Sequence, residues 1–173
     1  MINAMGSEEV FVVDDDRAIR LLVRKWLELE GYRVREFGDG EELMAAIDQT
    51  RPQAICLDVM MPKLDGLETL RLLRERGNRV PVILLSAKDM VQTAVEAMRL
   101  GAYDYIQKPF RNDELLAILR RAAEHRMLRM ENTVLKKEIR KRERRGAGAP
   151  VGQNRAWLDV LRLAEAVAPT EST

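Results

Sequence analysis

Short apolar segments alternate with segments of helical periodicity along most of the chain. Apolar or alternating positions predict five strands, in residues 10–13, 32–37, 54–58, 81–85 and 102–107. Apolar side chains at helical spacing predict the helices between them, in residues 17–30, 39–47, 67–76 and 89–100. Because short connections join each strand to a helix, the pattern predicts an α/β fold with a parallel sheet and right-handed crossovers.

The helical pattern that begins near Asn112 continues well beyond the length of a domain-closing helix. Two sets of positions at heptad spacing are candidates for the seam of a two-stranded coiled coil. The first set consists of His125, Leu128, Asn132, Leu135 and Ile139. The second set consists of Ala123, Met127, Met130 and Val134. The pattern therefore predicts a dimerisation helix and leaves both seams open.

Aspartates directly follow two of the predicted strands. Asp14 and Asp15 come after residues 10–13, and Asp58 ends the run Ala-Ile-Cys-Leu, whereas Asp16 beside Arg17 is expected to cap a helix. The carboxyl ends of neighbouring parallel strands meet at one edge, where open α/β sheets build their sites. Two carboxylates roughly 4 Å apart repel by about 4 kcal/mol at an effective dielectric constant near 20, so they must protonate, bind a cation or point apart. Of these three outcomes, we expect a divalent cation. Oxygen ligands favour magnesium, calcium or manganese over zinc.

Composition is typical of a soluble globular protein and excludes several kinds of site. The 173 residues are 46% hydrophobic and 33% charged, and 29 Lys and Arg against 28 Asp and Glu give a net charge of +1, so no global field favours nucleic acid or membrane. One Cys and one His exclude an internal disulfide and a Cys/His zinc cluster, which fits the reducing cytoplasm. No apolar run approaches the ~18 residues of a membrane span, and the first residues lack the pattern of a secretion signal.

Five short motifs, each at the carboxyl end of a predicted strand or in the turn after it, resemble those of a known family. They are Val12-Val13-Asp14-Asp15-Asp16, Asp58 with Met61-Pro62, Asp65-Gly66, Ser86-Ala87 and Lys108-Pro109-Phe110. In this order, they resemble the receiver domain of two-component response regulators over residues 9–121. The resemblance implies a flavodoxin-like, doubly wound sheet of five parallel strands in the order 2-1-3-4-5, with the helix after it extended as a linker.

The resemblance also implies the role of each acidic residue. Asp58 would be the phosphoacceptor, a carboxylate nucleophile that takes a phosphoryl group from a phosphohistidine on a sensor histidine kinase. Asp15, Asp58 and the backbone carbonyl of Met60 would hold Mg²⁺, and Asp14 would act mainly through bound water. The metal is expected because phosphoryl transfer depends chiefly on positioning and charge neutralisation.

Three further residues take roles by the same resemblance. Lys108 would pair with the phosphoryl group, and Ser86 would donate its hydroxyl to it. Ser86 and Tyr105 would form the switch pair, in which the hydroxyl moves onto the new phosphoryl oxygens and the ring turns inward. Pro109 makes the Lys108–Pro109 bond a candidate cis peptide.

The end of the chain carries a second resemblance. Residues 151–170 are similar to the opening of the AAA+ ATPase domain of sigma-54-dependent, nitrogen-regulation-type activators. The predicted layout is a disordered start (1–8), the receiver (9–121), a coiled-coil linker (122–145), a flexible break (146–150) and the first part of the AAA+ domain (151–173). No G-x-x-x-x-G-K-[ST] motif occurs, so the chain is expected neither to hydrolyse ATP nor to read DNA. Contacts with sigma-54 RNA polymerase and DNA would belong to domains beyond residue 173.

The sequence thus predicts a phosphorylation switch rather than an enzyme with turnover. The expected homodimer uses the face formed by the fourth helix, fifth strand and fifth helix, together with the linker helix. One alternative is a magnesium-dependent phosphatase that forms an aspartyl phosphate, but such an enzyme would have a second acid where Met60 stands. The other alternative is a receiver whose tail is a protein-docking helix rather than part of an ATPase.

Overall fold

The computed structural model describes residues 9–87 and 91–146, and the chain divides into two compact units, Met1–Arg129 and Met130–Thr173. The strands are β1 (Glu9–Val13), β2 (Arg33–Phe37), β3 (Ala54–Asp58), β4 (Val82–Ser86) and β5 (Asp104–Gln107). The helices are α1 (Arg17–Leu29), α2 (Gly40–Ala46), α3 (Gly66–Glu75), α4 (Val91–Arg99) and α5 (Asn112–Gly146). A helix follows every strand, as the apolar pattern predicts.

All five strands are parallel and lie in the order β2-β1-β3-β4-β5, so the predicted fold is confirmed. The central strands pair in register, with Val12 opposite Cys56 and Cys56 opposite Ile83. The chain winds outward in both directions from the β1–β3 pair. The carboxyl ends of these two strands therefore flank the crevice in which doubly wound sheets place their sites.

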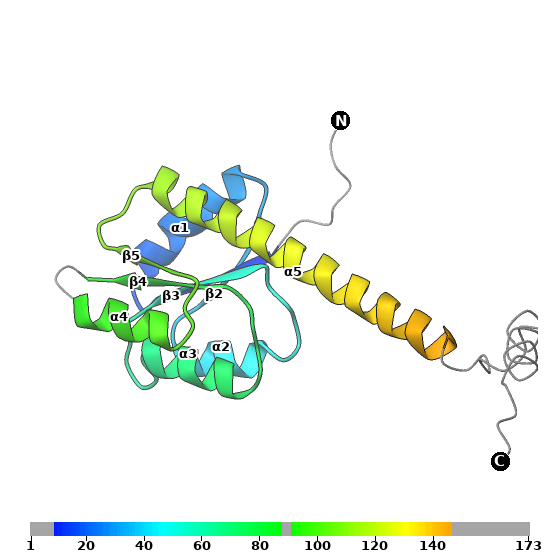
Figure 1. Ribbon diagram of the computed structural model, residues 1–173. Helices are drawn as coiled ribbons and strands as arrows, with labels where there is room; N and C mark the ends of the chain where they lie inside the picture. The colour runs from blue at the N-terminus through cyan, green and yellow to red at the C-terminus, as the bar shows by residue number, and fades with distance from the viewer. Residues whose placement is uncertain (1–8, 88–90, 147–173) are drawn as a thin grey trace, which may run out of the picture. The chain divides into compact units, whose positions relative to one another are not determined.

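Two apolar layers cover the sheet and fix its strands. One layer joins the sheet to α2, α3 and α4 through side chains such as Leu43, Leu70 and Ala97, and the other joins it to α1 and α5 through Leu27 and Leu115 (Figure 1). Every residue of β3 and of β4 is buried, which matches the continuous apolar runs expected for strands covered on both faces. The last residue of each of these strands is therefore held rigidly at the sheet edge.

Aspartate side chains begin three of the helices. Asp16, Asp39 and Asp65 accept hydrogen bonds from backbone N–H groups of the first turns of α1, α2 and α3, at 2.8, 2.9 and 2.8 Å. Such caps satisfy N–H groups that have no partner within the helix. The prediction that Asp16 is a cap is confirmed, and it separates this residue from the neighbouring Asp14 and Asp15.

Some element bounds differ from the predicted ones. The fifth strand begins at Asp104 rather than at residue 102, because its pairing with β4 begins where Asp104 lies opposite Ile83. The N–H of Tyr103 already donates to the carbonyl of Val82 in β4, at 2.8 Å. The fourth helix spans Val91–Arg99, and its predicted cap, Asp89, lies outside the described residues. The same holds for the predicted disordered start and for residues 147–173.

Helix α5 is one helix of 35 residues, Asn112–Gly146. Its first turns bury Leu115, Leu119 and Ala122 against the sheet. Farther along, Leu128 and Leu135 are 65% and 57% exposed, so the apolar positions of the continued helix have no cover within this chain's described residues. In the part of the chain that the structure describes, no helix has both the length and the apolarity needed to cross a membrane.

Gly66 allows the turn after β3 to pass close to the strand end. A Cβ atom at this position would lie 2.2 Å from the carbonyl oxygen of Asp58 and 2.8 Å from the Cα of Val59. Both atoms belong to the backbone, so no side-chain rotation relieves the overlap. The N–H of Gly66 also donates to the carbonyl of Val59 at 2.9 Å, which closes the turn.

We therefore expect Gly66→Ala to lower the free energy of unfolding by about 1–3 kcal/mol, the usual cost of forcing atoms into packed space. Urea denaturation monitored by circular dichroism measures the loss. Gly38→Ala is the matched control, because the nearest atom to its Cβ would be the flexible Glu42 Oε2 at 3.5 Å. The control should stay within about 0.5 kcal/mol of the parent protein. Equal stability of the two variants would contradict this account of the turn.

Candidate functional site

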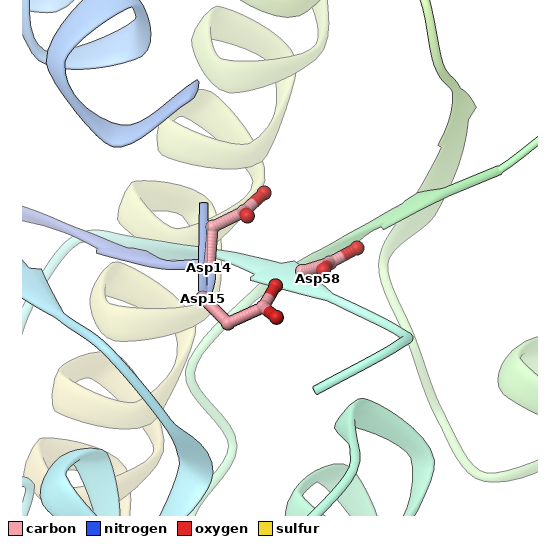
Figure 2. A group of neighbouring side chains, drawn as sticks. All are labelled: Asp14, Asp15 and Asp58. Atoms are coloured by element: carbon pink, nitrogen blue, oxygen red, sulfur yellow. The ribbon is translucent and has the colours of Figure 1, made fainter. Parts of the chain in front are cut away.

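Three carboxylates meet at the carboxyl ends of β1 and β3. Asp14 and Asp15 come from the loop after β1, and Asp58 is the last residue of β3 (Figure 2). One carboxylate oxygen from each lies within 4.8 Å of the others. Asp14 and Asp58 are buried, whereas Asp15 is exposed. The sheet order produces this cluster, because it makes the two strands neighbours.

Both carboxylate oxygens and the backbone N–H of Asp14 have hydrogen-bond partners. Its Oδ2 accepts a hydrogen bond from the Lys108 ammonium at 2.7 Å, and its Oδ1 accepts one from the N–H of Asp16 at 2.9 Å. Its own N–H donates to the carbonyl of Phe37 in β2 at 3.2 Å. A fully buried carboxylate with these partners has a fixed position, so it can orient the lysine that it binds.

Lys108 connects two of the acidic groups. Its Nζ lies 2.7 Å from Asp14 Oδ2 and 3.0 Å from Asp58 Oδ1. Burial lowers the pKa of this lysine, but its hydrogen bonds to Asp14 and Asp58 raise it by more, so the pKa lies above the usual value. The ammonium therefore stays protonated at neutral pH. The Lys108–Pro109 peptide bond is cis, as predicted from the sequence.

Asp58 is electrostatically destabilised in its ionised form. Burial raises the pKa of its carboxyl to about 6, against the hydrogen bond from Lys108, which lowers it. The charges of Asp14 and Asp15 raise the pKa further. One ammonium thus faces three carboxylates, and the cluster carries excess negative charge at neutral pH.

The excess charge and the oxygen donors fit a hard divalent cation. Asp15 is the open member of the cluster, because its carboxylate has no hydrogen bond or ion pair with any residue that the structure describes. Met60 follows Asp58 by two residues at the same sheet edge and is 61% exposed. Carboxylate and carbonyl oxygens are the ligands that Mg²⁺ and Ca²⁺ prefer. The residues present therefore fit the predicted metal.

Ser86 and Tyr105 lie on the α4 side of the sheet. Ser86 is the last residue of β4, fully buried, and its carbonyl accepts the N–H of Lys108 at 2.6 Å. Tyr105 is half-buried against the apolar layer between the sheet and helices α2, α3 and α4. In the sheet it lies opposite Leu84, two residues before Ser86. Because alternate residues of a strand share a face, both side chains lie on the face that α4 covers.

The structure brings five of the predicted site residues to one edge of the sheet: Asp14, Asp15, Asp58, Lys108 and Ser86. Tyr105 lies two residues before the end of β5. Two contacts could not be read from the sequence. The ion pair between Asp14 and Lys108 joins residues 94 positions apart. The guanidinium of Arg20 binds the carbonyl oxygens of Asp14 and Asp15. No sequence motif marks either contact, since both depend on how strands and helices pack.

The raised pKa of Asp58 gives a stability prediction with a definite sign. Between about pH 4 and pH 6 the folded protein holds a proton that the unfolded chain has lost, so stability falls as pH rises through this window. At pH 7, with chelator present, Asp58→Asn should raise the free energy of unfolding by about 1–2 kcal/mol, allowing for solvent screening. Denaturation at pH 7 and pH 5 measures the gain, which should shrink at pH 5.

The matched control is Asp48→Asn, because the Asp48 side chain is 72% exposed. This variant should change stability by less than about 0.5 kcal/mol at both pH values. A gain for Asp58→Asn that is the same at pH 5 and pH 7 would contradict the electrostatic origin of the effect.

Two curated relatives have sequences similar to part of this chain. Response regulator MprA of Mycobacterium ulcerans (strain Agy99) is 47% identical over 114 residues, which cover 66% of this chain and 49% of the relative. Response regulator MprA of Mycolicibacterium vanbaalenii is 48% identical over 111 residues, which cover 64% and 48%. The chain therefore spans about half the length of these curated relatives.

Solved structures show the same fold. The receiver domain of NtrX from Brucella abortus has a TM-score of 0.64 and 38% identity, over 66% of this chain and 98% of that one. A longer structure of NtrX from Brucella abortus has a TM-score of 0.72 and 34% identity, over 95% of this chain and 35% of that one. The family model described as "Response regulator receiver domain" matches residues 10–120. This chain belongs to the response regulator family and carries its receiver domain.

Proposed function

We propose that this chain is a Mg²⁺-dependent phosphoacceptor switch whose Asp58 takes a phosphoryl group from a sensor histidine kinase. The observation that carries the proposal is the position of Lys108, whose ammonium contacts both the buried Asp14 and Asp58. The ammonium compensates part of the negative charge of these two buried groups. It stands where a phosphoryl group on Asp58 would present its new negative charge.

The transfer needs a nucleophile and a fixed cation from this chain. A carboxylate oxygen of Asp58 attacks the phosphorus of the phosphohistidine and forms an O–P bond as the P–N bond breaks, and the electron pair of that bond stays on the imidazole nitrogen. Lys108 then gives up its contact with Asp58 for a phosphoryl oxygen. Asp14 keeps hold of the ammonium during this exchange, because its own contact to Lys108 does not involve the reacting group.

The acidic cluster would hold the metal through Asp15, Asp58 and the backbone carbonyl of Met60, with Asp14 acting mainly through bound water. Mg²⁺, when bound, supplies charge neutralisation for the phosphoryl oxygens. Asp15 is the natural first ligand, because its carboxylate is exposed and is not engaged by another described side chain. The nucleophile itself is ionised more readily once the negative field around it is compensated.

Ser86 and Tyr105 would carry the change from the site to α4. Both lie on the face of the sheet that α4 covers, and Ser86 shares a backbone hydrogen bond with Lys108. A phosphoryl group adds about −1.5 to −2 charge and three acceptor oxygens, which would draw the hydroxyl toward Asp58. The space it leaves would admit the ring of Tyr105.

For the whole protein, we propose a sigma-54-dependent activator with an AAA+ output domain, acting in the cytoplasm. The similarity to the longer NtrX structures supports this, because it covers 95% of this chain and so continues past the receiver. One of these two structures is described as a complex with ADP. A third NtrX structure, which matches 75% of this chain, is described as a complex with ATP. The relatives named MprA, which align over 64–66% of this chain, give the sigma-54 assignment no support. Contacts with sigma-54 RNA polymerase and DNA would lie in the remaining domains.

The proposed homodimer uses two surfaces. Val95 and Met98 on α4 are 49% and 51% exposed, as the predicted face of α4, β5 and α5 requires. On the continued α5, Leu128, Leu135 and Ile139 are exposed at heptad spacing. We favour this seam over the one through Met127 and Val134, since that one runs on into charged positions, Lys137 and Lys141.

Intact-mass measurement tests the phosphoacceptor role. Incubated with acetyl phosphate and Mg²⁺, the chain should gain one phosphoryl group, and Asp58→Asn should gain none. Lys108→Met should slow the gain by about 100-fold or more, because a group that stabilises transferring charge is typically worth 10²–10³ in rate. A phosphoryl group found on Asp58→Asn would contradict the assignment. Steady turnover of a phosphate ester that depends on Asp58 would instead support the phosphatase alternative.

Analytical ultracentrifugation tests the seam on α5. Leu135→Lys would place a charge in the dimer seam and should weaken self-association at least about tenfold, because burying an unpaired charge costs more than about 1.4 kcal/mol. Val134→Lys is the matched control, since Val134 is equally exposed at 56% but lies outside the proposed seam. If Val134→Lys is the variant that dissociates, the other seam is used. A parent chain that is monomeric with and without beryllofluoride would contradict the dimer.

A further inference from the structure

Arg20 in α1 contacts the backbone of the loop after β1, the acidic loop, which carries Asp14 and Asp15. Its Nη1 donates to the carbonyl oxygen of Asp14 at 2.6 Å and to that of Asp15 at 3.2 Å. The side chain is only 18% exposed, so water competes little for these hydrogen bonds. Hydrogen bonds from a charged donor are stronger than those between neutral groups.

The guanidinium is itself held from a third element. Its Nε lies 3.8 Å from Glu36 Oε1 in β2, and the opposite oxygen of Glu36 binds Arg24 Nη1 at 3.1 Å. Glu36 pairs with Val12 of β1 in the sheet. Arg20 is thus fixed by the strand beside the one whose loop it contacts.

These two carbonyl groups flank a single Cα atom, that of Asp15. The carbonyl of Asp14 belongs to the peptide plane before this atom, and the carbonyl of Asp15 belongs to the plane after it. Because peptide planes are rigid, fixing both of them fixes the direction of the Cα–Cβ bond of Asp15, about which its carboxylate rotates. The carboxylate of Asp15 has no hydrogen-bond or ion-pair partner among the residues that the structure describes, so the direction of this bond limits the positions that its rotamers can reach.

We propose that Arg20 is a positioning residue for the Asp15 carboxylate, which sets the affinity of the acidic cluster for a divalent cation. This inference rests on the proposed function, in which Asp15 is a metal ligand. Arg20 touches neither the reacting carboxylate of Asp58 nor Lys108 through any contact that the structure records. Its loss therefore weakens cation binding and leaves the transfer step intact once the cation is bound.

Calorimetric titration with Mg²⁺ tests the inference. In Arg20→Met, which keeps the aliphatic part of the side chain, the dissociation constant should rise about tenfold, as for loss of other groups that orient a metal ligand. At saturating Mg²⁺ the rate of phosphorylation by acetyl phosphate should stay within about twofold of the parent rate. Arg24→Met is the matched control, because Arg24 also binds Glu36 but touches no carbonyl of the loop. It should bind Mg²⁺ like the parent chain.

Arg20→Lys separates positioning from charge, because the ammonium ends short of Nη1 and cannot keep both carbonyl contacts. We expect most of the loss of affinity to remain in this variant. Parental affinity in Arg20→Lys or in Arg20→Met overturns the inference, as does a slower transfer rate at saturating Mg²⁺. A parent chain that binds no Mg²⁺ overturns the proposed function and the inference with it. The rise in Tm on adding Mg²⁺ gives a second measure of binding for each variant.

Discussion

The ammonium of Lys108, held between two buried carboxylates, is the interaction on which the site depends. Asp14 and Asp58 are almost fully buried, so bulk solvent screens the repulsion between their charges only weakly. Without the ammonium at 2.7 and 3.0 Å, the two charges would face each other across the sheet edge. Hydrogen bonds with Asp16 and Phe37 also fix Asp14, so this residue is the constant partner of Lys108. In the proposed transfer, a phosphoryl oxygen replaces Asp58 as the other partner.

Packing in the rest of the fold keeps these groups at one edge of the sheet and prevents them from moving apart. β3 and β4 are buried along their whole length, so Asp58 and Ser86 cannot retreat from the edge. The turn after β3 passes so close to Asp58 that only glycine fits at position 66. Burial raises the pKa of Asp58 to about 6, so the folded state carries a cost at neutral pH that a cation would offset. Groups with strongly shifted pKa values are typical of functional sites, and here the shift costs stability at neutral pH.

In the proposed function, the residues that position the cation ligands and the residues that carry the change to α4 lie on opposite sides of the sheet. On the α1 side, Arg20 contacts Glu36 and the loop that carries Asp14 and Asp15, which includes the proposed cation ligand Asp15. On the α4 side, Ser86 and Tyr105 lie under a helix with exposed apolar side chains. We infer that the first side stays fixed during phosphorylation, while the second side repacks and alters the surface that meets another protein.

The sequence by itself determined the alternation of strands and helices, the caps at Asp16 and the aspartates at two strand ends, because these features follow from local periodicity and from single residues. Motif resemblance added the strand order and the lysine at the end of the last strand. Only the tertiary structure decided that Asp14 binds Lys108, 94 positions later in the sequence, and that Arg20 binds the carbonyl of Asp14. Only the tertiary structure, too, shows that burial raises the pKa of Asp58. These features depend on distances between elements and on the exclusion of water, which no local pattern records.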